Sequence, residues 1–284
     1  MTTTPLVTTQ WLADHLKSPD IVILDASWHL PQMGRNAESE YQDAHIPGAI
    51  PFDIDDVSDP ASGLPHTMPQ PHAFSSKMRK MGIGDGQTIV AYDGIGFFSA
   101  PRVWWMFKAM GVRDVFVLDG GLPKWTSEGR PLEDGPPRQR PPRHFTARLD
   151  HGTMADIEAV KRATQSGDRQ LLDARSPGRF SGEEKEPRAG MRSGHMRGAK
   201  NLHYAKLVNE DGTLKSAAEL KTLYEAAGID LARPVITTCG SGVTAAILTL
   251  GLTVLGSSDL KLYDGSWAEW GGRVDTDVST DPAA

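Results

Sequence analysis

One loop of this sequence gathers residue types that suit nucleophilic chemistry. It contains the only cysteine of the 284-residue chain, Cys239, followed by Gly240-Ser241-Gly242-Val243-Thr244. The two glycines permit backbone conformations that turn successive N–H groups toward the sulfur. A helix beginning directly after the loop would add partial positive charge at its N-terminus. Both effects favour the thiolate, which is the nucleophilic form of cysteine. The loop therefore predicts a reactive thiolate in an anion-binding turn.

The segments around this loop alternate short apolar runs with amphipathic stretches, which is typical of an α/β fold. After the middle apolar run of each half, apolar residues recur at helical spacing, at 103, 106, 107 and 110 and again at 243, 246, 247 and 250. We expect each half to form a mainly parallel sheet flanked by helices. Cys239 then follows the carboxyl end of a strand, where such sheets bind ligands. The clearest strands are predicted at 21–24, 89–92, 115–118, 170–172, 235–238 and 260–263.

Several motifs occur twice along the chain, in the same order and at nearly constant spacing. The repeated pairs are Asp25 and Asp173, His45 and His195, and Asp119 and Asp264, with offsets of 148, 150 and 145 residues. These offsets indicate a tandem duplication of the whole α/β unit. An offset of 146 residues aligns Asp93 in the first copy with Cys239 in the second. The second copy therefore has a nucleophile where the first has a carboxylate, so we expect the first copy to be catalytically inactive.

A segment rich in proline and arginine, residues 134–143, separates the two copies. Its four prolines lack backbone donors and its arginines favour water, so we interpret it as an extended, solvated linker. This places the first domain at residues 1–135, the linker at 136–148 and the second domain at 149–284.

The composition excludes several classes of function. Thirty basic and 36 acidic residues give a net charge of −6, which offers no attraction for nucleic acid or an anionic membrane surface. We find no secretory leader and no apolar run approaching the roughly 18 residues that span a bilayer. A single cysteine forms neither an internal disulfide nor a multi-cysteine metal site. We expect a cytoplasmic protein without a metal or cofactor.

Longer stretches of the sequence resemble the 3-mercaptopyruvate sulfurtransferases of the rhodanese superfamily. The resemblance covers nearly the whole chain and includes HIPGAIPFDID (45–55), SAPRVWWMF (99–107), LDGGLPKW (118–125), CGSGVTA (239–245) and LYDGSWAEW (262–270). It implies two rhodanese-like domains with the active loop in the second. It further implies that sulfur passes from 3-mercaptopyruvate to a persulfide on Cys239, with release of pyruvate. The acceptor would be a thiol, such as that of thioredoxin, or cyanide.

The resemblance assigns a proton relay to three residues that lie far apart in the sequence. Ser241 matches the loop serine of this relay, His66 its histidine and Asp55 its acid. His66 would move a proton through Ser241 while Asp55 fixes the tautomer of the imidazole. Judged by its neighbours alone, His66 is better interpreted as a histidine of a proline-rich surface loop, so its relay role follows only from the resemblance.

Substrate-binding residues also follow from the resemblance. Arg179 and Arg188 match two arginines that bind the carboxylate and keto oxygen of the donor, a task suited to the guanidinium fork. Without the resemblance, their charged neighbours at 183–186 favour a solvated charged loop. The remaining predicted binding residues belong to the cysteine loop, and they are Gly240, Gly242, Val243 and Thr244.

Three other functions fit parts of this pattern. A thiosulfate sulfurtransferase would favour cationic residues after the cysteine, whereas Gly240 and Ser241 are neutral. A cysteine-loop phosphatase would need an arginine at position 245, which is alanine. A silent binding protein would fit the first copy, but the Cys239 loop argues against it for the whole chain. Sulfur transfer from 3-mercaptopyruvate is therefore the favoured function, with thiosulfate as the alternative donor.

Overall fold

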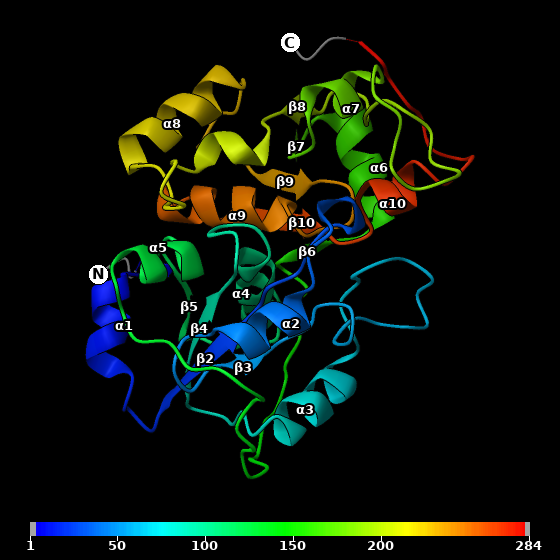
Figure 1. Ribbon diagram of the computed structural model, residues 1–284. Helices are drawn as coiled ribbons and strands as arrows, with labels where there is room; N and C mark the ends of the chain where they lie inside the picture. Colours follow the sequence, from blue (N-terminus) through cyan, green and yellow to red (C-terminus); the bar gives the residue numbers. More distant parts are fainter. Residues whose placement is uncertain (1–3, 282–284) are drawn as a thin grey trace.

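The computed structural model describes residues 4–281, and it contains two α/β domains built in the same order. Figure 1 shows one domain above the other, with the chain passing once between them. The elements of the first domain are β1 (Leu6–Val7), α1 (Thr9–His15), β2 (Ile21–Asp25), η1 (Pro31–Met33), α2 (Ala37–Asp43), β3 (Ile50–Pro51), α3 (Pro71–Lys80), β4 (Thr88–Tyr92), α4 (Ala100–Ala109), β5 (Val115–Leu118) and α5 (Gly121–Ser127). Those of the second are β6 (Met154–Ala155), α6 (Ile157–Ser166), β7 (Gln170–Asp173), α7 (Pro177–Ser181), β8 (Lys200–Asn201), η2 (Tyr204–Leu207), α8 (Ala217–Ala226), β9 (Val235–Thr238), α9 (Ala245–Val254), β10 (Leu260–Tyr263) and α10 (Ser266–Trp270).

Each domain contains a five-stranded sheet whose paired strands are all parallel. The strand order is β1-β5-β4-β2-β3 in the first sheet and β6-β10-β9-β7-β8 in the second. All six predicted strands are present, and β4 and β9 occupy the centre of their sheets. The predicted α/β duplication is therefore confirmed. One expectation was wrong in detail, because α9 begins at Ala245 and leaves Val243 in the preceding loop, where it is nevertheless buried.

The two domains share one hydrophobic core. The helices that follow the central strands, α4 and α9, contact each other between the two sheets (Figure 1). Residues of both helices, such as Val103 and Leu248, belong to a single buried cluster. The opposite face of each sheet has its own smaller cluster, covered by α1, α2 and α5 in the first domain and by α6, α7 and α10 in the second. Burial of this shared apolar surface holds the two domains together.

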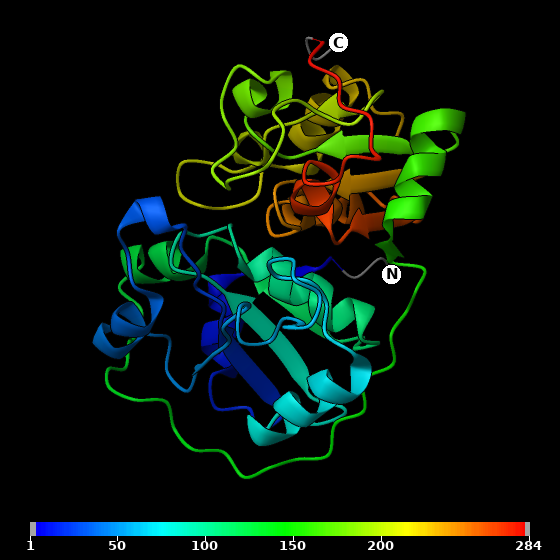
Figure 2. The same cartoon turned by 90° about the vertical axis from the view of Figure 1, so that its right-hand side faces the viewer.

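The segment between the copies has no helix or strand from residue 136 to 150. Figure 2 shows it, in green, running along the outside of the first domain before it enters the second. Phe145 anchors it, because this ring is 2% exposed and lies 5.8 Å from Phe74 and 6.3 Å from Phe107 between ring centroids. The segment is thus extended, and it is fastened to the first domain by this ring and by backbone hydrogen bonds, such as that from the Arg148 N–H to the Met110 carbonyl at 2.9 Å. None of the helices described is long and apolar enough to cross a membrane.

Candidate active site around Cys239

The cysteine loop turns back onto its own sulfur at the carboxyl end of β9. The Cys239 side chain is buried, and the Gly242 N–H points at its sulfur with an N to Sγ distance of 3.1 Å. Gly242 has a φ of +82°, a left-handed conformation that glycine adopts without strain. A Cβ atom at this position would lie 2.9 Å from Nη1 of Arg102, so the loop also needs glycine for space. The sulfur therefore sits against a backbone donor.

The corresponding loop of the first domain already holds an anion of its own. Asp93 is buried at the end of β4, and its carboxylate accepts five backbone N–H groups. Oδ1 accepts from Ile95 and Gly96, and Oδ2 accepts from Phe98, Ser99 and Ala100, at 2.8–3.0 Å. A strand-to-helix loop of this fold can thus hold negative charge with backbone donors alone. In the first domain the internal carboxylate occupies these donors.

The structure brings the three predicted relay residues into one hydrogen-bonded chain. The Nδ1 of His66 lies 2.9 Å from the Ser241 hydroxyl, and its Nε2 lies 2.9 Å from Oδ1 of Asp55. His66 and Asp55 belong to the first domain and Ser241 to the second, so the chain crosses the domain interface. The hydrogen bond from His66 holds the pKa of Asp55 below its ordinary value of 3.8, against the opposing effect of burial. An ionised Asp55 that accepts from Nε2 leaves Nδ1 free to accept the hydroxyl proton of Ser241.

His66 is held in an unusual backbone conformation. Its φ is +61°, in the left-handed region that non-glycine residues seldom occupy. The buried guanidinium of Arg102 donates to the carbonyl of His66 and to Oδ1 of Asp264, the latter at 2.7 Å. Asp264 in turn accepts the N–H of Met68 at 2.6 Å. These contacts fix the His66 segment against the second domain, which supports the strained conformation.

The two predicted substrate-binding arginines lie beside the cysteine loop but differ in their partners. Arg179 donates from Nε to Glu186 at 3.1 Å and pairs with the same carboxylate through Nη2. Arg188 has no ion pair or hydrogen bond with any residue from 4 to 281. Burial lowers its pKa, while the charge of Cys239 opposes that shift. A Cβ atom on Gly240 would lie 3.1 Å from Arg179 and 3.8 Å from Arg188, so both guanidinium groups border the loop.

These residues enclose a cavity of about 190 Å³ between the two domains. Its volume suits a small organic acid rather than a drug-sized ligand, which needs about 300 Å³ or more. Of the predicted site residues, His66, Asp55 and Gly242 do not line the cavity, and the first two lie behind Ser241. Those that line it are Cys239, Gly240, Ser241, Val243, Thr244, Arg179 and Arg188. The described residues contain no cluster of metal-ligating side chains.

Four further residues at this site were not predicted from the sequence. Trp28 and Tyr204 line the cavity, Glu186 holds Arg179, and Arg102 holds the His66 segment. Two of them left a signal in the sequence. Trp28 follows the predicted strand at 21–24, at the edge of the sheet where ligands bind. Arg102 is a charged residue within an apolar helix, which requires a buried partner.

Comparison with known proteins agrees with this architecture. Residues 8–128 and 156–273 each match the rhodanese-like domain family. The chain is 42% identical to 3-mercaptopyruvate sulfurtransferase of Escherichia coli (strain K12), over 98% of this chain and 99% of that protein. It is 41% identical to thiosulfate sulfurtransferase of Cricetulus griseus, over 93% and 91% of the two chains. The crystal structure of SseA from Escherichia coli, a 3-mercaptopyruvate sulfotransferase, superposes with a TM-score of 0.86 at 40% identity, covering 93% of this chain and 99% of that one. The chain therefore belongs to the rhodanese family of sulfurtransferases.

Proposed function

We propose that this protein transfers sulfur from 3-mercaptopyruvate through a persulfide on Cys239. The observation that carries this proposal is the hydrogen-bonded chain of Asp55, His66 and Ser241, which ends in the cysteine loop. A relay of this kind is useful for a donor whose leaving group must take up a proton. The second domain then performs the chemistry, and the first, with Asp93 in place of the cysteine, supplies the relay histidine and acid.

The reaction balances without a metal or redox cofactor. The Cys239 thiolate attacks the donor sulfur, a sulfur–sulfur bond forms, and the carbon–sulfur bond breaks with its electron pair on carbon 3. That carbon, an enolate of pyruvate, takes up through Ser241 and His66 the proton that the donor thiol loses. Pyruvate leaves and a persulfide anion remains on Cys239. Backbone donors such as the Gly242 N–H can stabilise this anion, as the corresponding loop does for Asp93.

The two arginines suit a small 2-oxo acid. Arg188, whose guanidinium has no partner among the described residues, can bind the donor carboxylate through two hydrogen bonds. Arg179, held by Glu186, can present its remaining N–H groups to the keto oxygen. Gly240 leaves room for both, because any side chain there would approach Arg179.

Thiosulfate is the second candidate donor, and the similarity to a thiosulfate sulfurtransferase favours it. Its leaving group, sulfite, needs no proton, so the relay would serve no purpose in that reaction. The loop after Cys239 also lacks the cationic side chains that a dianion would favour. We expect thiosulfate to be the weaker donor.

We also propose a thiol, such as that of thioredoxin, or cyanide as the acceptor. Either attacks the outer sulfur of the persulfide and restores the Cys239 thiolate. A cytoplasmic location is part of this proposal, because a reducing compartment keeps a free cysteine available as a thiolate.

Replacement of Cys239 by serine tests the proposal. Steady-state rates are measured with 3-mercaptopyruvate and with thiosulfate, using reduced thioredoxin and cyanide as acceptors. Mass spectrometry checks whether 3-mercaptopyruvate alone adds one sulfur atom to the wild-type protein. We expect activity with both donors, and the added sulfur, to disappear in Cys239→Ser. Unchanged transfer in this variant would refute the proposal, and a higher kcat/KM for thiosulfate in the wild type would favour the alternative donor.

A further inference from the structure

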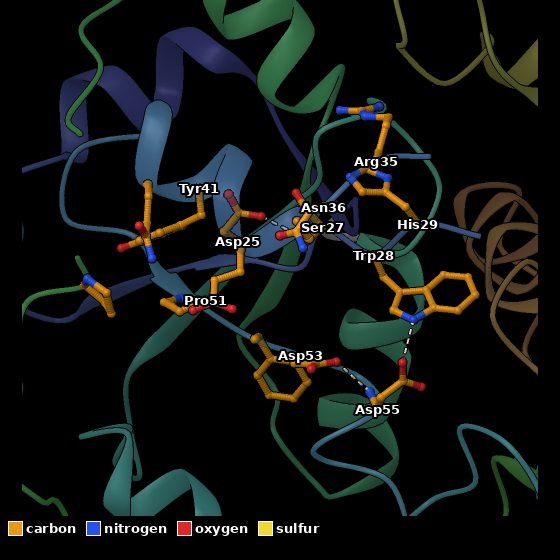
Figure 3. A pocket seen from close by; sticks show the side chains of 15 residues that line it. Asp25, Ser27, Trp28, His29, Arg35, Asn36, Tyr41, Pro51, Asp53 and Asp55 are labelled. Atoms are coloured by element: carbon orange, nitrogen blue, oxygen red, sulfur yellow. Dashed lines mark hydrogen bonds between the residues drawn. The ribbon is translucent and has the colours of Figure 1, made fainter. Parts of the chain in front are cut away.

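Trp28 lies between the proton relay and the catalytic cavity. It follows β2, and its indole Nε1–H donates to Oδ2 of Asp55 at 2.8 Å (Figure 3). The indole meets the His66 ring edge to face, with ring centroids 4.8 Å apart and an interplanar angle of 80°. Its other neighbour is Phe98, which stacks on it at 6.2 Å. One side chain therefore contacts both first-domain members of the relay.

Trp28 lines two cavities. It lines the cavity of about 190 Å³ that contains Cys239, and also a pocket of about 470 Å³ in the first domain. Asp55 lines the second pocket, and its side chain is 59% exposed, whereas the side chain of His66 is 3% exposed. Without a second partner, a carboxylate so exposed could rotate or bind water in place of the imidazole. Trp28 removes this freedom, because Oδ1 binds His66 while Oδ2 binds the indole.

We propose that Trp28 is a positioning residue of the relay, which orients the Asp55 carboxylate toward His66 so that Nδ1 of His66 serves Ser241. The inference rests on the proposed function, since only a donor that requires a proton depends on the relay. Trp28 acts through Asp55 and also forms part of the cavity wall. Its role differs from that of Arg179 and Arg188, which are proposed to bind the substrate directly.

The electrostatics of Asp55 agree with this role. The indole hydrogen bond helps to lower the pKa of Asp55, after the larger effect of the hydrogen bond from His66. The positive charge of Arg188, which lines the cavity, also lowers the pKa of Asp55. The backbone N–H of Asp55 is held separately, by Oδ1 of Asp53 at 2.8 Å. Among residues 4–281, the indole thus contributes the one hydrogen bond to the second carboxylate oxygen.

Trp28→Phe tests the inference, because phenylalanine keeps an aromatic ring in the wall but removes the donor. The measured quantity is the single-turnover rate of pyruvate release from 3-mercaptopyruvate, compared with the rate of sulfite release from thiosulfate. We expect a fall of about tenfold for 3-mercaptopyruvate, with thiosulfate changed by less than about twofold. Trp125→Phe is the matched control, since Trp125 donates its indole N–H to the Pro131 carbonyl at 2.8 Å, away from the site. It should leave both rates unchanged.

A double-mutant cycle with Asp55→Asn then asks whether Trp28 acts through Asp55. If it does, adding Trp28→Phe to Asp55→Asn causes no further loss. Equal losses for both donors, no loss for either, or the same loss in the Asp55→Asn background would each overturn the inference. Absence of 3-mercaptopyruvate turnover in the wild type would instead refute the proposed function, so the two failures are distinguishable.

Discussion

At the scale of single residues, the two arginines of the site have the same charge but different freedom. The side chain of Glu186 is 3% exposed and binds both Arg175 and Arg179, so it holds Arg179 in one orientation. Arg188 has no such partner within residues 4–281 and lines the cavity together with Cys239. A guanidinium that lies beside the nucleophile and has no internal partner is the group most available to bind the carboxylate of the donor. Binding of the donor should therefore depend mainly on Arg188.

Arg188→Ala should raise the KM for 3-mercaptopyruvate by roughly 10- to 100-fold, because it removes charge-assisted hydrogen bonds to the donor. The KM for thiosulfate, which has no carboxylate, should rise much less. Steady-state kinetics with both donors measures the difference. Arg197→Ala is a suitable control, since Arg197 is exposed and lies in the same domain. Equal increases in KM for the two donors would contradict the role of Arg188 as a carboxylate ligand.

At the scale of elements, the loops after β4 and β9 use one architecture for two purposes. The loop after β4 surrounds Asp93 with backbone donors, and the loop after β9 turns the Gly242 N–H toward the sulfur of Cys239. In the first loop these backbone donors are hydrogen-bonded to the Asp93 carboxylate and need no ligand. We infer that Asp93 stabilises the fold of the first domain rather than contributing to turnover.

Asp93→Asn should lower the free energy of unfolding by about 1–3 kcal/mol, because the amide offers one acceptor oxygen where the carboxylate offers two. The KM for 3-mercaptopyruvate should stay unchanged. Urea unfolding followed by steady-state kinetics checks both quantities. Asp20→Asn, at an exposed position, should change neither of them. A loss of activity at full stability would show that Asp93 takes part in the reaction.

At the scale of the whole molecule, the duplication creates the same interdomain contact twice. Asp264 accepts the N–H of Met68 at 2.6 Å, and its counterpart Asp119 accepts the N–H of Leu214 at 2.8 Å. The same spacing aligns His66 with Gly212, and both have a positive φ, +61° and +80°. One half of this pseudosymmetric interface therefore carries the relay histidine, and the other half carries a glycine. The active site therefore depends on a difference between two otherwise equivalent interdomain contacts, the histidine in one and the glycine in the other.

The repeated contact provides a matched pair of variants. Asp264→Asn should reduce pyruvate release from 3-mercaptopyruvate, because it removes the ion pair of the Arg102 guanidinium that binds the His66 carbonyl. It should also destabilise the protein by about 3–5 kcal/mol, since a buried charge loses its partner. Asp119→Asn removes the charge from the corresponding backbone contact but touches no relay residue. Single-turnover rates and urea unfolding compare the two, and equal losses of activity would contradict the proposed coupling.

The sequence by itself determined the features that depend on local patterns. The strands and the helices after β4 and β9 follow from the periodicity of apolar residues, which reports burial directly. The duplication and the alignment of Asp93 with Cys239 follow from near-constant spacing. The cysteine loop was recognisable because its glycines and its place after a strand are contiguous in the chain. Asp55, His66, Arg179 and Arg188 were identified through the family resemblance, and their catalytic roles stay predictions.

Only the tertiary structure decided which distant side chains meet. His66 reaches Ser241 across 175 residues, and Arg102 reaches Asp264 across 162. Trp28 and Asp55 are 27 residues apart in different loops, and no periodic pattern connects them. Such contacts depend on how α4 and α9 pack the two domains together. This packing results from the burial of apolar surface, and it leaves no local sequence pattern at the polar residues that it brings together. The nucleophile can therefore be identified from the sequence, whereas the residues that orient the proton relay are identified only from the packing of the two domains.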